Sequence, residues 1–392
     1  METTFNELGQ TDRVLWFTDT FGDHNGVAMV LQSIHREIKE RDLPIDILVC
    51  SNTIKSDRNL IVIKPISEFN IPFYPQQPLR LPNYITIQSI FRKGRYNRII
   101  CSTEGPMGFA ALYIRKIYSV KSYFYLHTDW VTFGKQVMAM EEAGLRRLQR
   151  LMRIYYNRFD GIFVLNSEQQ EWLTGELMRL DRSRIFMTAH WADEVFSNLK
   201  NKRSERFRSI KRDPVVLFAG RVSKEKGVFE LPEIFRKAKQ KVPELKMIIA
   251  GTGPAEKELK NLFPEAEFLG WVDQNQLSEI FHRADLFLFP SRFDTFGCVV
   301  IEAFSCGLPV IAYNTKGPKD IIQDHVNGFL VESPNEIADR TIEYFSDENM
   351  RNFFKKSAVI RANDYSSHKI LQQLLKDIEI NTFFLSLSND AA

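Results

Sequence analysis

The sequence contains little cysteine, little net charge and no long apolar run. Its 392 residues include only four cysteines, which form no Cys-x-x-Cys pair and lie near no histidine at a metal-ligand spacing. This argues against a disulfide framework and against a metal site built on cysteines, which read as small buried apolar residues. No stretch approaches the roughly 18 uninterrupted apolar residues of a membrane span. The net charge of +3 is too small to make nucleic acid a main partner.

The N-terminal residues METTFNELGQTDR are polar and acidic, unlike a signal peptide. Together with the unpaired cysteines, they predict a cytoplasmic protein. The length exceeds that of one typical core and indicates two domains.

Short apolar runs alternate with amphipathic segments along the chain, which predicts an α/β fold with doubly wound parallel sheets. Ligands then bind at the carboxyl ends of the strands. The proline-rich segment 65–82 predicts a loop, and residues 135–158 predict one long helix. A densely basic segment without apolar periodicity, 199–214, indicates a hinge between domains.

One stretch, FPSRFDTFGCVVIEAFSCGLPVIAY at 289–313, predicts a strand, a loop, a helix that begins near Phe296 and Gly297, and a second strand. Asp294 stands in the loop and Glu302 inside the helix, with seven residues between them. The amides at the start of the helix, at Gly297, Cys298 and Val299, favour an anion such as a phosphate. Carboxylates beside a phosphate site are suited to sugar hydroxyls, so the pattern indicates a sugar nucleotide.

A second loop, GRVSKEKG at 220–227, directly follows the apolar run 215–219. Arg221 and Lys226 stand five positions apart between two glycines. A guanidinium binds phosphate as a fork and an ammonium as a point charge, so this loop is suited to a diphosphate.

Both loops resemble signatures of the retaining glycosyltransferases of the GT-B fold, in particular glycosyltransferase family 4. The stretch 289–313 is similar to the family's Glu-x7-Glu motif, with Asp294 in place of the first Glu. A subset of the family, which includes mannosyltransferase-like and glycolipid-synthesising members, also resembles this sequence in having Asp at the first acidic position. Gly220-Arg221-x4-Lys226-Gly227 is similar to the family's phosphate clamp.

The resemblance implies two Rossmann-like domains that face one another across a cleft. It assigns residues 1–198 to an acceptor domain, 199–214 to a basic hinge and 215–365 to a donor domain. Residues 366–392 then form a C-terminal helix that crosses back to the first domain.

The resemblance also implies site residues outside the two loops. His127, at the end of the strand 122–126, is expected beside the donor sugar. Asn25 and Gly26 are expected to close over the diphosphate, although an ordinary turn explains them as well. The remaining positions, expected around the nucleotide, are Gly251, Gly253, Val272 and Phe296.

The implied reaction transfers a hexose, mannose or glucose, from a UDP- or GDP-sugar to a glycan or lipid-linked acceptor. It retains the α-configuration and needs no metal and no further cofactor. Arg221, Lys226 and the helix start are expected to hold the departing diphosphate. Glu302 is expected to bind the ribose and Asp294 the far hydroxyls of the sugar.

Two alternatives stay open. Arg146, Arg147, Arg150 and Arg153 lie along the helix expected at 135–158, which suits either peripheral contact with the inner membrane or a solvated face. A non-catalytic protein that binds sugar nucleotides or a membrane surface would also carry these features. A dinucleotide oxidoreductase is disfavoured, because Gly251-Thr-Gly253 has Glu256 where a third glycine is needed.

Overall fold

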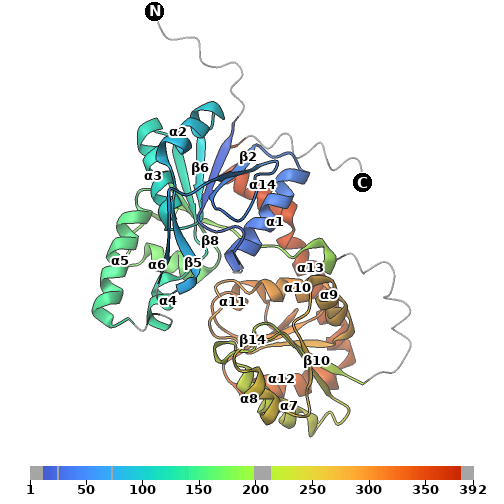
Figure 1. Cartoon of the computed structure of the whole chain (residues 1–392). Coiled ribbons are helices and arrows are strands. Elements are labelled where there is room, and N and C mark those ends of the chain that lie inside the picture. Colours follow the sequence, from blue (N-terminus) through green and yellow to red (C-terminus); the bar gives the residue numbers. More distant parts are fainter. Residues whose placement is uncertain are drawn as a thin grey trace, which may run out of the picture. The chain divides into compact units, whose positions relative to one another are not determined.

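The structure is a computed structural model that describes residues 12–23, 26–71, 74–136, 138, 140–197 and 213–380. The chain separates into two compact units (Figure 1). Unit 1 runs to Thr188 and takes up the chain again from Leu371. Unit 2 comprises Ala189–Ile370. Both are parallel sheets covered by helices, as the sequence predicts.

Unit 1 is built on seven parallel strands in the order β3-β2-β1-β6-β7-β8-β9. Its strands are β1 (Val14–Thr18), β2 (Ile45–Cys50), β3 (Leu60–Ile63), β6 (Arg98–Cys101), β7 (Lys121–Tyr125), β8 (Gly161–Val164) and β9 (Ile185–Met187). Every residue of β1 and β2 is buried, as in a sheet with both faces covered. The order reverses between β1 and β6, which makes the loops after these strands the switch point of the sheet.

The helices of unit 1 are α1 (Gly26–Glu40), α2 (Tyr84–Lys93), α3 (Pro106–Tyr118), α4 (Trp130–Gln136), α5 (Glu142–Tyr156), α6 (Ser167–Thr174) and the 3-10 turn η1 (Arg182–Arg184). The single long helix predicted at 135–158 is wrong. The chain turns after α4, where the amide of Met140 donates to the carbonyl of Gly134 at 2.9 Å, and α5 begins after an extended Glu141. Leu145 and Leu148 then pack against Gly134, because glycine leaves room for them.

The loop predicted at 65–82 is also wrong, because β4 (Ser67–Ile71) and β5 (Tyr74–Leu81) pair there as an antiparallel hairpin. Pro75 and Pro78 lie on β5, a position that prolines tolerate because a two-stranded ribbon has only edge strands.

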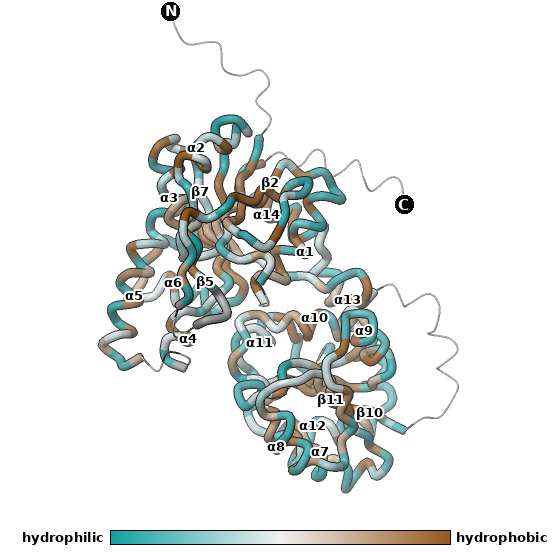
Figure 2. Tube along the Cα trace, viewed as in Figure 1, coloured by the Kyte–Doolittle hydropathy of each residue, from teal (hydrophilic) through white to brown (hydrophobic). Residues whose placement is uncertain are grey.

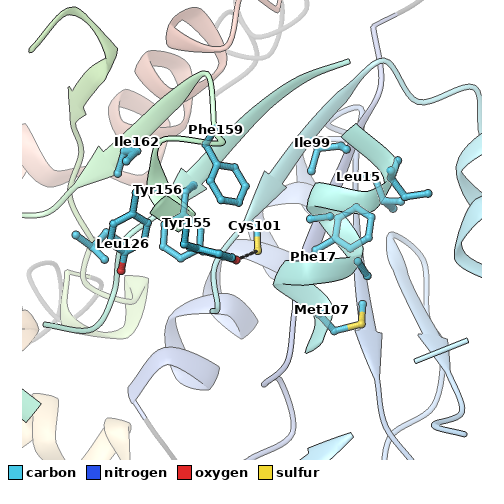
Figure 3. Packing of buried hydrophobic residues seen from close by; sticks show 14 of the residues in the cluster. Leu15, Phe17, Ile99, Cys101, Met107, Leu126, Tyr155, Tyr156, Phe159 and Ile162 are labelled. Carbon is cyan, nitrogen blue, oxygen red and sulfur yellow. Dashed lines mark hydrogen bonds between the residues drawn. The ribbon is translucent and has the colours of Figure 1, made fainter. Parts of the chain in front are cut away.

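Aromatic side chains fill the core of unit 1 between its sheet and the helices α3 and α5 (Figure 3). Phe124 packs against Tyr156 and Phe159 with ring centroids 5.1 and 5.2 Å apart. Tyr155 reaches Cys101 on β6, with its hydroxyl 4.0 Å from the sulfur. The end of α5 is therefore held by the core.

Unit 2 contains six parallel strands in the order β12-β11-β10-β13-β14-β15. They are β10 (Val215–Ala219), β11 (Lys246–Ala250), β12 (Glu267–Gly270), β13 (Leu286–Phe289), β14 (Val310–Tyr313) and β15 (Gly328–Val331). The helices are α7 (Leu231–Lys239), α8 (Glu256–Leu262), α9 (Gln274–Arg283), α10 (Cys298–Ser305), α11 (Pro318–Ile321), α12 (Pro334–Ser346) and α13 (Glu348–Ala362), and the 3-10 turns are η2 (Glu194–Phe196), η4 (Lys224–Lys226), η5 (Val228–Glu230) and η6 (Asn363–Tyr365). The switch point lies between β10 and β13.

The boundary between the units differs from the predicted one at residue 198. Residues 189–197 belong to unit 2, because Ser278 donates to the carbonyl of Val195 at 2.9 Å and Phe196 packs on Phe281. The predicted hinge, 199–214, lies outside the described residues except for Asp213 and Pro214.

The last helix, α14 (Ser367–Asp377), leads the chain from unit 2 into unit 1. Beyond it, Lys121 pairs with Glu379 at 2.5 Å, and Arg98 donates to the carbonyl of Ile378 at 3.1 Å. The C-terminal segment is therefore part of unit 1.

Candidate functional site

The loops at the switch point of unit 2 join Lys226 to Asp294. Lys226 ends η4, in the loop after β10, and Asp294 lies in the loop after β13. The ammonium nitrogen of Lys226 donates to Oδ1 of Asp294 at 2.6 Å, and both side chains are largely shielded from solvent. Two of the charges predicted for the site therefore lie together, at the edge of the sheet where ligands of this fold bind.

Glycines allow these loops to touch backbone to backbone. Gly227 has a φ of 71°, and a Cβ added to it would lie 2.0 Å from the carbonyl oxygen of Pro290. Gly317 has a φ of 86°, and a Cβ added to it would lie 2.7 Å from the carbonyl oxygen of Phe296. Both conformations favour glycine. The loops after β10, β13 and β14 thus form one closely packed frame.

Gly251 and Gly253, which are predicted to lie around the nucleotide, also allow close packing between these loops. A Cβ on Gly251 would lie 1.9 Å from the carbonyl oxygen of Gly220, and one on Gly253 would lie 2.2 Å from that of Val222. The amide of Gly251 also donates to the carbonyl of Gly270 at 2.7 Å, shortly before Val272. These contacts explain the glycines by packing between loops.

Helix α10 begins beside the ion pair. Gly297 precedes it with φ of 87°, so the helix starts at Cys298, slightly later than predicted. The first amides of a helix, here those of Cys298 and Val299, have no partner within the helix, and this end carries partial positive charge. Burial raises the pKa of the Cys298 thiol to about 12, and the carboxylates of Glu302 and Asp294 add to this shift. Cys298 is therefore a neutral thiol near pH 7.

Glu302 lies one turn into α10 and is half-buried. Burial raises the pKa of Glu302 to about 7, and repulsion by the carboxylate of Asp193 adds to the shift. Asp193 comes from the segment before η2, and no sequence pattern pointed to it. Glu302 thus changes its charge close to neutral pH.

Three buried polar atoms of these loops have no hydrogen-bond partner among the described residues: Oγ of Ser291, Oδ2 of Asp294 and Oγ1 of Thr315. Ser291 is only 1% exposed. A buried polar atom without a partner costs about 1–3 kcal/mol. Such atoms are rare in folded proteins, and a polar ligand bound at this strand edge would supply the missing partners. Sequence reasoning did not single out Ser291 or Thr315.

Two other predicted residues lie outside the ion pair. Arg221 is exposed, and its guanidinium lies 3.9 Å from Glu225 rather than beside Asp294. The ring of Phe296 is buried against His190, at 4.9 Å between ring centroids, and Tyr365, at 6.1 Å, so it packs within unit 2. Burial lowers the pKa of His190 to about 3, so this histidine is neutral.

The predicted residues of unit 1 lie at the ends of its strands. His127 follows β7, is buried and stacks on Tyr125 with ring centroids 4.6 Å apart. Gly26 is the first residue of α1, and a Cβ added there would meet nothing within 4 Å. Asn25 lies outside the described residues.

The switch point of unit 1 holds two carboxyl groups that the sequence did not reveal. Asp19 accepts the amide of Met107 at 2.9 Å and the hydroxyl of Thr103 at 2.6 Å, and Glu104 accepts the hydroxyl of Tyr156 at 2.7 Å. Burial raises the pKa of Asp19 to about 6 and that of Glu104 to about 7. Asp19 holds the start of α3, so its role is structural.

Within the described residues, no group of three or more His, Cys, Asp or Glu side chains could hold a metal ion. The same part of the chain contains no helix that combines the length and the apolar character needed to cross a membrane.

The fold of the chain matches known proteins. Sucrose-phosphate synthase from Thermosynechococcus elongatus superposes with a TM-score of 0.72, covering 97% of this chain and all of that one at 16% identity. The family described as Glycosyltransferase Family 4 matches residues 24–193, and the one described as Glycosyl transferases group 1 matches residues 200–360. The two matches together take in most of the chain. This chain belongs to the family 4-like glycosyltransferases of the GT-B fold.

Its relatives are named transferases. Sulfoquinovosyl transferase SQD2 from Arabidopsis thaliana is 29% identical over 69% of this chain, and the chain spans about half (53%) of that protein. A GDP-mannose-dependent alpha-mannosyltransferase from Corynebacterium glutamicum is 25% identical over 78% of this chain and 72% of its own. Alpha-monoglucosyldiacylglycerol synthase from Streptococcus pneumoniae is 21% identical over 96% and 89%. Because the chain spans only about half of the first of these proteins, the transferase activity that the sequence predicts stays a proposal for this chain.

Proposed function

We propose that this protein transfers a hexose, mannose or glucose, from a nucleoside diphosphate sugar to a hydroxyl of a glycan or lipid-linked acceptor, with retention of the α-configuration. The observation that carries the proposal is the Lys226–Asp294 pair at the switch point of unit 2, beside the start of α10 and the unpartnered atoms of Ser291 and Asp294. The names of the mannosyl and glucosyl relatives support the sugar and the linkage.

The ion pair prepares Lys226 for a diphosphate. Its ammonium has three N–H donors and gives one of them to Asp294, so two remain for phosphate oxygens. The start of α10 adds partial positive charge on the same side. Both act on charge that grows as the diphosphate departs, and each such donor is worth about 3 kcal/mol in the transition state.

Arg221 fits this scheme as a mobile second cation. Its guanidinium is exposed and only loosely paired with Glu225. A long exposed side chain reorients at little cost, and its fork suits two phosphate oxygens. Two cations and a helix start together do the work that a metal ion does in other transferases, so we propose that catalysis needs no metal and no further cofactor.

The carboxyl groups bind hydroxyls. Oδ2 of Asp294 is buried and unpartnered, which suits a sugar hydroxyl, while Glu302 on α10 is assigned to the ribose. The neutral thiol of Cys298 is unsuited to act as a nucleophile. We therefore propose that the leaving phosphate itself takes the proton of the acceptor. His127 of unit 1 is assigned to the donor sugar from the family resemblance.

The proposal also places the protein in the cytoplasm, peripherally attached to the inner membrane where the acceptor is lipid-linked. The basic helix α5 supports this part, because cationic amphipathic helices bind anionic membrane surfaces.

The deciding experiment measures release of UDP or GDP from a panel of glucose and mannose donors, with and without glycan and diacylglycerol acceptors. We expect one donor to release its nucleotide only when an acceptor is present, and EDTA to leave the rate unchanged. NMR of the product should show an α-anomer from an α-linked donor. Tight nucleotide binding without any turnover across the panel would instead support a non-catalytic binding protein.

A further inference from the structure

A second ion pair joins the two loops that carry Lys226 and Asp294. Glu230 ends η5, four positions after Lys226, and Arg292 stands two positions before Asp294. Nη2 of Arg292 lies 3.7 Å from Oε1 of Glu230. The charges are reversed relative to the first pair, because here the loop after β10 supplies the anion and the loop after β13 supplies the cation. Two ion pairs of opposite direction therefore bridge the same two loops.

Tyr313, at the end of β14, contacts both members of the second pair. Its hydroxyl donates to Oε2 of Glu230, and the guanidinium carbon of Arg292 lies 3.5 Å from the centre of its ring. Burial raises the pKa of Tyr313, and the carboxylate of Glu230 adds to this shift, so the hydroxyl keeps its proton and remains a donor. Glu230, Arg292 and Tyr313 together are called the Glu230 cluster below.

The Glu230 cluster is anchored in the sheet of unit 2. The strands of this sheet are hydrophobic, as the brown tube at β11 illustrates (Figure 2). β14 is buried along its whole length and pairs with β13 on one side and with β15 on the other. Tyr313 is 1% exposed. Its ring therefore gives Arg292 a fixed surface to pack on, just beyond the ends of the strands.

Each member of the cluster makes two contacts, which distinguishes it from an ordinary surface ion pair. Glu230 uses one carboxylate oxygen for Tyr313 and faces Arg292 with the other. A single exposed ion pair holds a loop weakly. A guanidinium that stacks on an aromatic ring and also pairs with a carboxylate is restricted by both contacts. Lysine in place of Arg292 would lack the flat surface that this stacking needs.

In the loop after β13, the cluster acts next to Asp294. Only Phe293 separates Arg292 from Asp294 in the chain, and the side chain of Phe293 is 48% exposed. A half-exposed side chain holds a loop less firmly than a buried one, because it removes less apolar surface from water. The position of Asp294 therefore depends on the contacts of Arg292.

In the loop after β10, the cluster acts behind Lys226. The chain turns tightly between Lys226 and Glu230, where the amide of Glu230 donates to the carbonyl of Gly227 at 3.0 Å. Gly227 packs its backbone against Pro290 of the other loop. Because this turn is short and is held by hydrogen bonds, a displacement of Glu230 also displaces Lys226.

We propose that Arg292 is a positioning residue of the transfer reaction. Stacked on Tyr313 and paired with Glu230, it fixes the loops after β10 and β13 relative to one another. Lys226 and Asp294 are thereby held in the geometry that the donor requires. The inference rests on the proposed function, because Arg292 acts through the two residues assigned there to the diphosphate and the sugar and does not touch the donor itself.

The test compares Arg292→Gln in two backgrounds, the unmodified protein and Lys226→Ala. In the unmodified protein, the substitution should lower kcat/KM about a hundredfold, because a misplacement of about 1 Å costs a reaction that much. In the Lys226→Ala background, it should cause a further loss of less than about threefold, because residues that act as a unit are not additive. Equal losses in both backgrounds would overturn the proposal, since Arg292 would then act independently of Lys226.

Arg340 of α12 provides a matched control. Its guanidinium carbon lies 5.2 Å from the centre of the Phe329 ring, and it pairs with Glu343 at 2.5 Å. Its side chain is 37% exposed, against 39% for Arg292. Arg340→Gln removes the same kinds of contact from a helix that carries none of the site residues, so kcat/KM should stay unchanged. A loss as large as that of Arg292→Gln would show a general effect on unit 2 and would refute the positioning role.

A second variant, Arg292→Lys, keeps the charge and removes the flat guanidinium. It should lose most of the activity that Arg292→Gln loses, while its melting temperature stays close to that of the Arg340→Gln control. Full activity in Arg292→Lys would show that charge alone is sufficient, and the stacking on Tyr313 would then have no role in positioning.

The same comparisons are made on the binding of UDP and GDP by isothermal titration, which needs no turnover. Arg292→Gln should weaken binding of the preferred nucleotide about tenfold, as for one charged hydrogen bond to phosphate, and should have no further effect in the Lys226→Ala background. This pattern without turnover of any donor would refute the transfer reaction and support the positioning role. Turnover and binding that Arg292→Gln leaves unchanged would refute the positioning role alone, and binding of neither nucleotide by the unmodified protein would refute both.

Discussion

Units 1 and 2 reverse their strand order at the same place, beside the first strand of each sheet, but the two switch points differ in what their carboxyl groups do. In unit 1, both oxygens of Asp19 accept hydrogen bonds from its own unit, and Glu104 accepts one from Tyr156. In unit 2, Asp294 keeps one oxygen without a partner and shares the other with Lys226. The carboxyl groups of the unit 1 switch point are thus used within the fold, whereas Asp294 keeps an oxygen available for a ligand.

The largest effect should come from removing the cation of this pair. Lys226→Ala should lower kcat/KM by two to three orders of magnitude, which corresponds to about 3–4 kcal/mol of transition-state stabilisation. The reason is that the negative charge of the leaving diphosphate loses one hydrogen-bond donor. Lys224→Ala is the matched control, since Lys224 is an exposed lysine of the same 3-10 turn. Equal rates for both variants would remove the phosphate role of Lys226.

Glycine substitutions compare the loops of the two units. Gly227→Ala should destabilise the protein by about 3 kcal/mol, because its Cβ meets the carbonyl of Pro290 in a left-handed conformation. Gly26→Ala in unit 1 should change the free energy of unfolding by less than about 0.5 kcal/mol, because its Cβ meets nothing. Denaturant unfolding measures both, and similar losses would contradict the close packing of the unit 2 loops.

Alanine at each switch-point acid tests the contrast directly. Asp19→Ala should cost about 2 kcal/mol of stability, because the amide of Met107 and the hydroxyl of Thr103 lose their acceptor, and it should leave donor binding intact. Asp294→Ala should cost about 1 kcal/mol or less, as for a partly exposed ion pair, and should weaken donor binding. Melting curves measure the loss of stability, and titrations with nucleotide sugars measure donor binding. Weaker donor binding in Asp19→Ala together with a larger loss of stability in Asp294→Ala would contradict the proposed roles.

The smallest effect concerns pH. The pKa of Glu302 is about 7 in the folded protein, against an ordinary 4.5, so the folded state holds a proton that the unfolded state has lost between these values. The stability associated with this proton is present below about pH 4.5 and is lost as pH rises through 7. The full shift corresponds to about 3 kcal/mol, which solvent around the half-buried side chain reduces to about 1 kcal/mol. Glu302→Gln should therefore be more stable than the unmodified protein by about 1 kcal/mol at pH 8 and equally stable at pH 4.5. A constant difference at all pH values would contradict the raised pKa.

The sequence predicted both parallel sheets, because continuous apolar runs such as Val215–Ala219 are specific to buried strands. It also predicted Lys226 and Asp294 as site residues, because glycines and a helix start stand beside them in the chain, and the structure brings the two side chains together. The sequence did not identify their ion pair, because no local pattern shows which loops lie together. The sequence did not predict a role for Ser291, Thr315 or Asp193, because isolated polar residues produce no periodic pattern.

Two other differences have similar causes. The break between α4 and α5 depends on Leu145 and Leu148 packing onto Gly134, a contact between segments that each have helical periodicity. The hairpin β4–β5 contains prolines that normally indicate a loop, yet two edge strands accept them. In both places tertiary packing decided between structures that local sequence leaves equally favourable.

The return of the chain to unit 1 through α14 has a consequence for how the protein is made. Leu371, Leu374 and Leu375 are buried, and Ile378 and Glu379 bind the first residues of β6 and β7, Arg98 and Lys121. During synthesis, the ribosome completes unit 2 before it translates the segment that begins at Leu371. Unit 1 therefore has apolar surface exposed to solvent until this last segment is made. Loss of the segment that begins at Leu371 would therefore harm the half of the protein that is translated first.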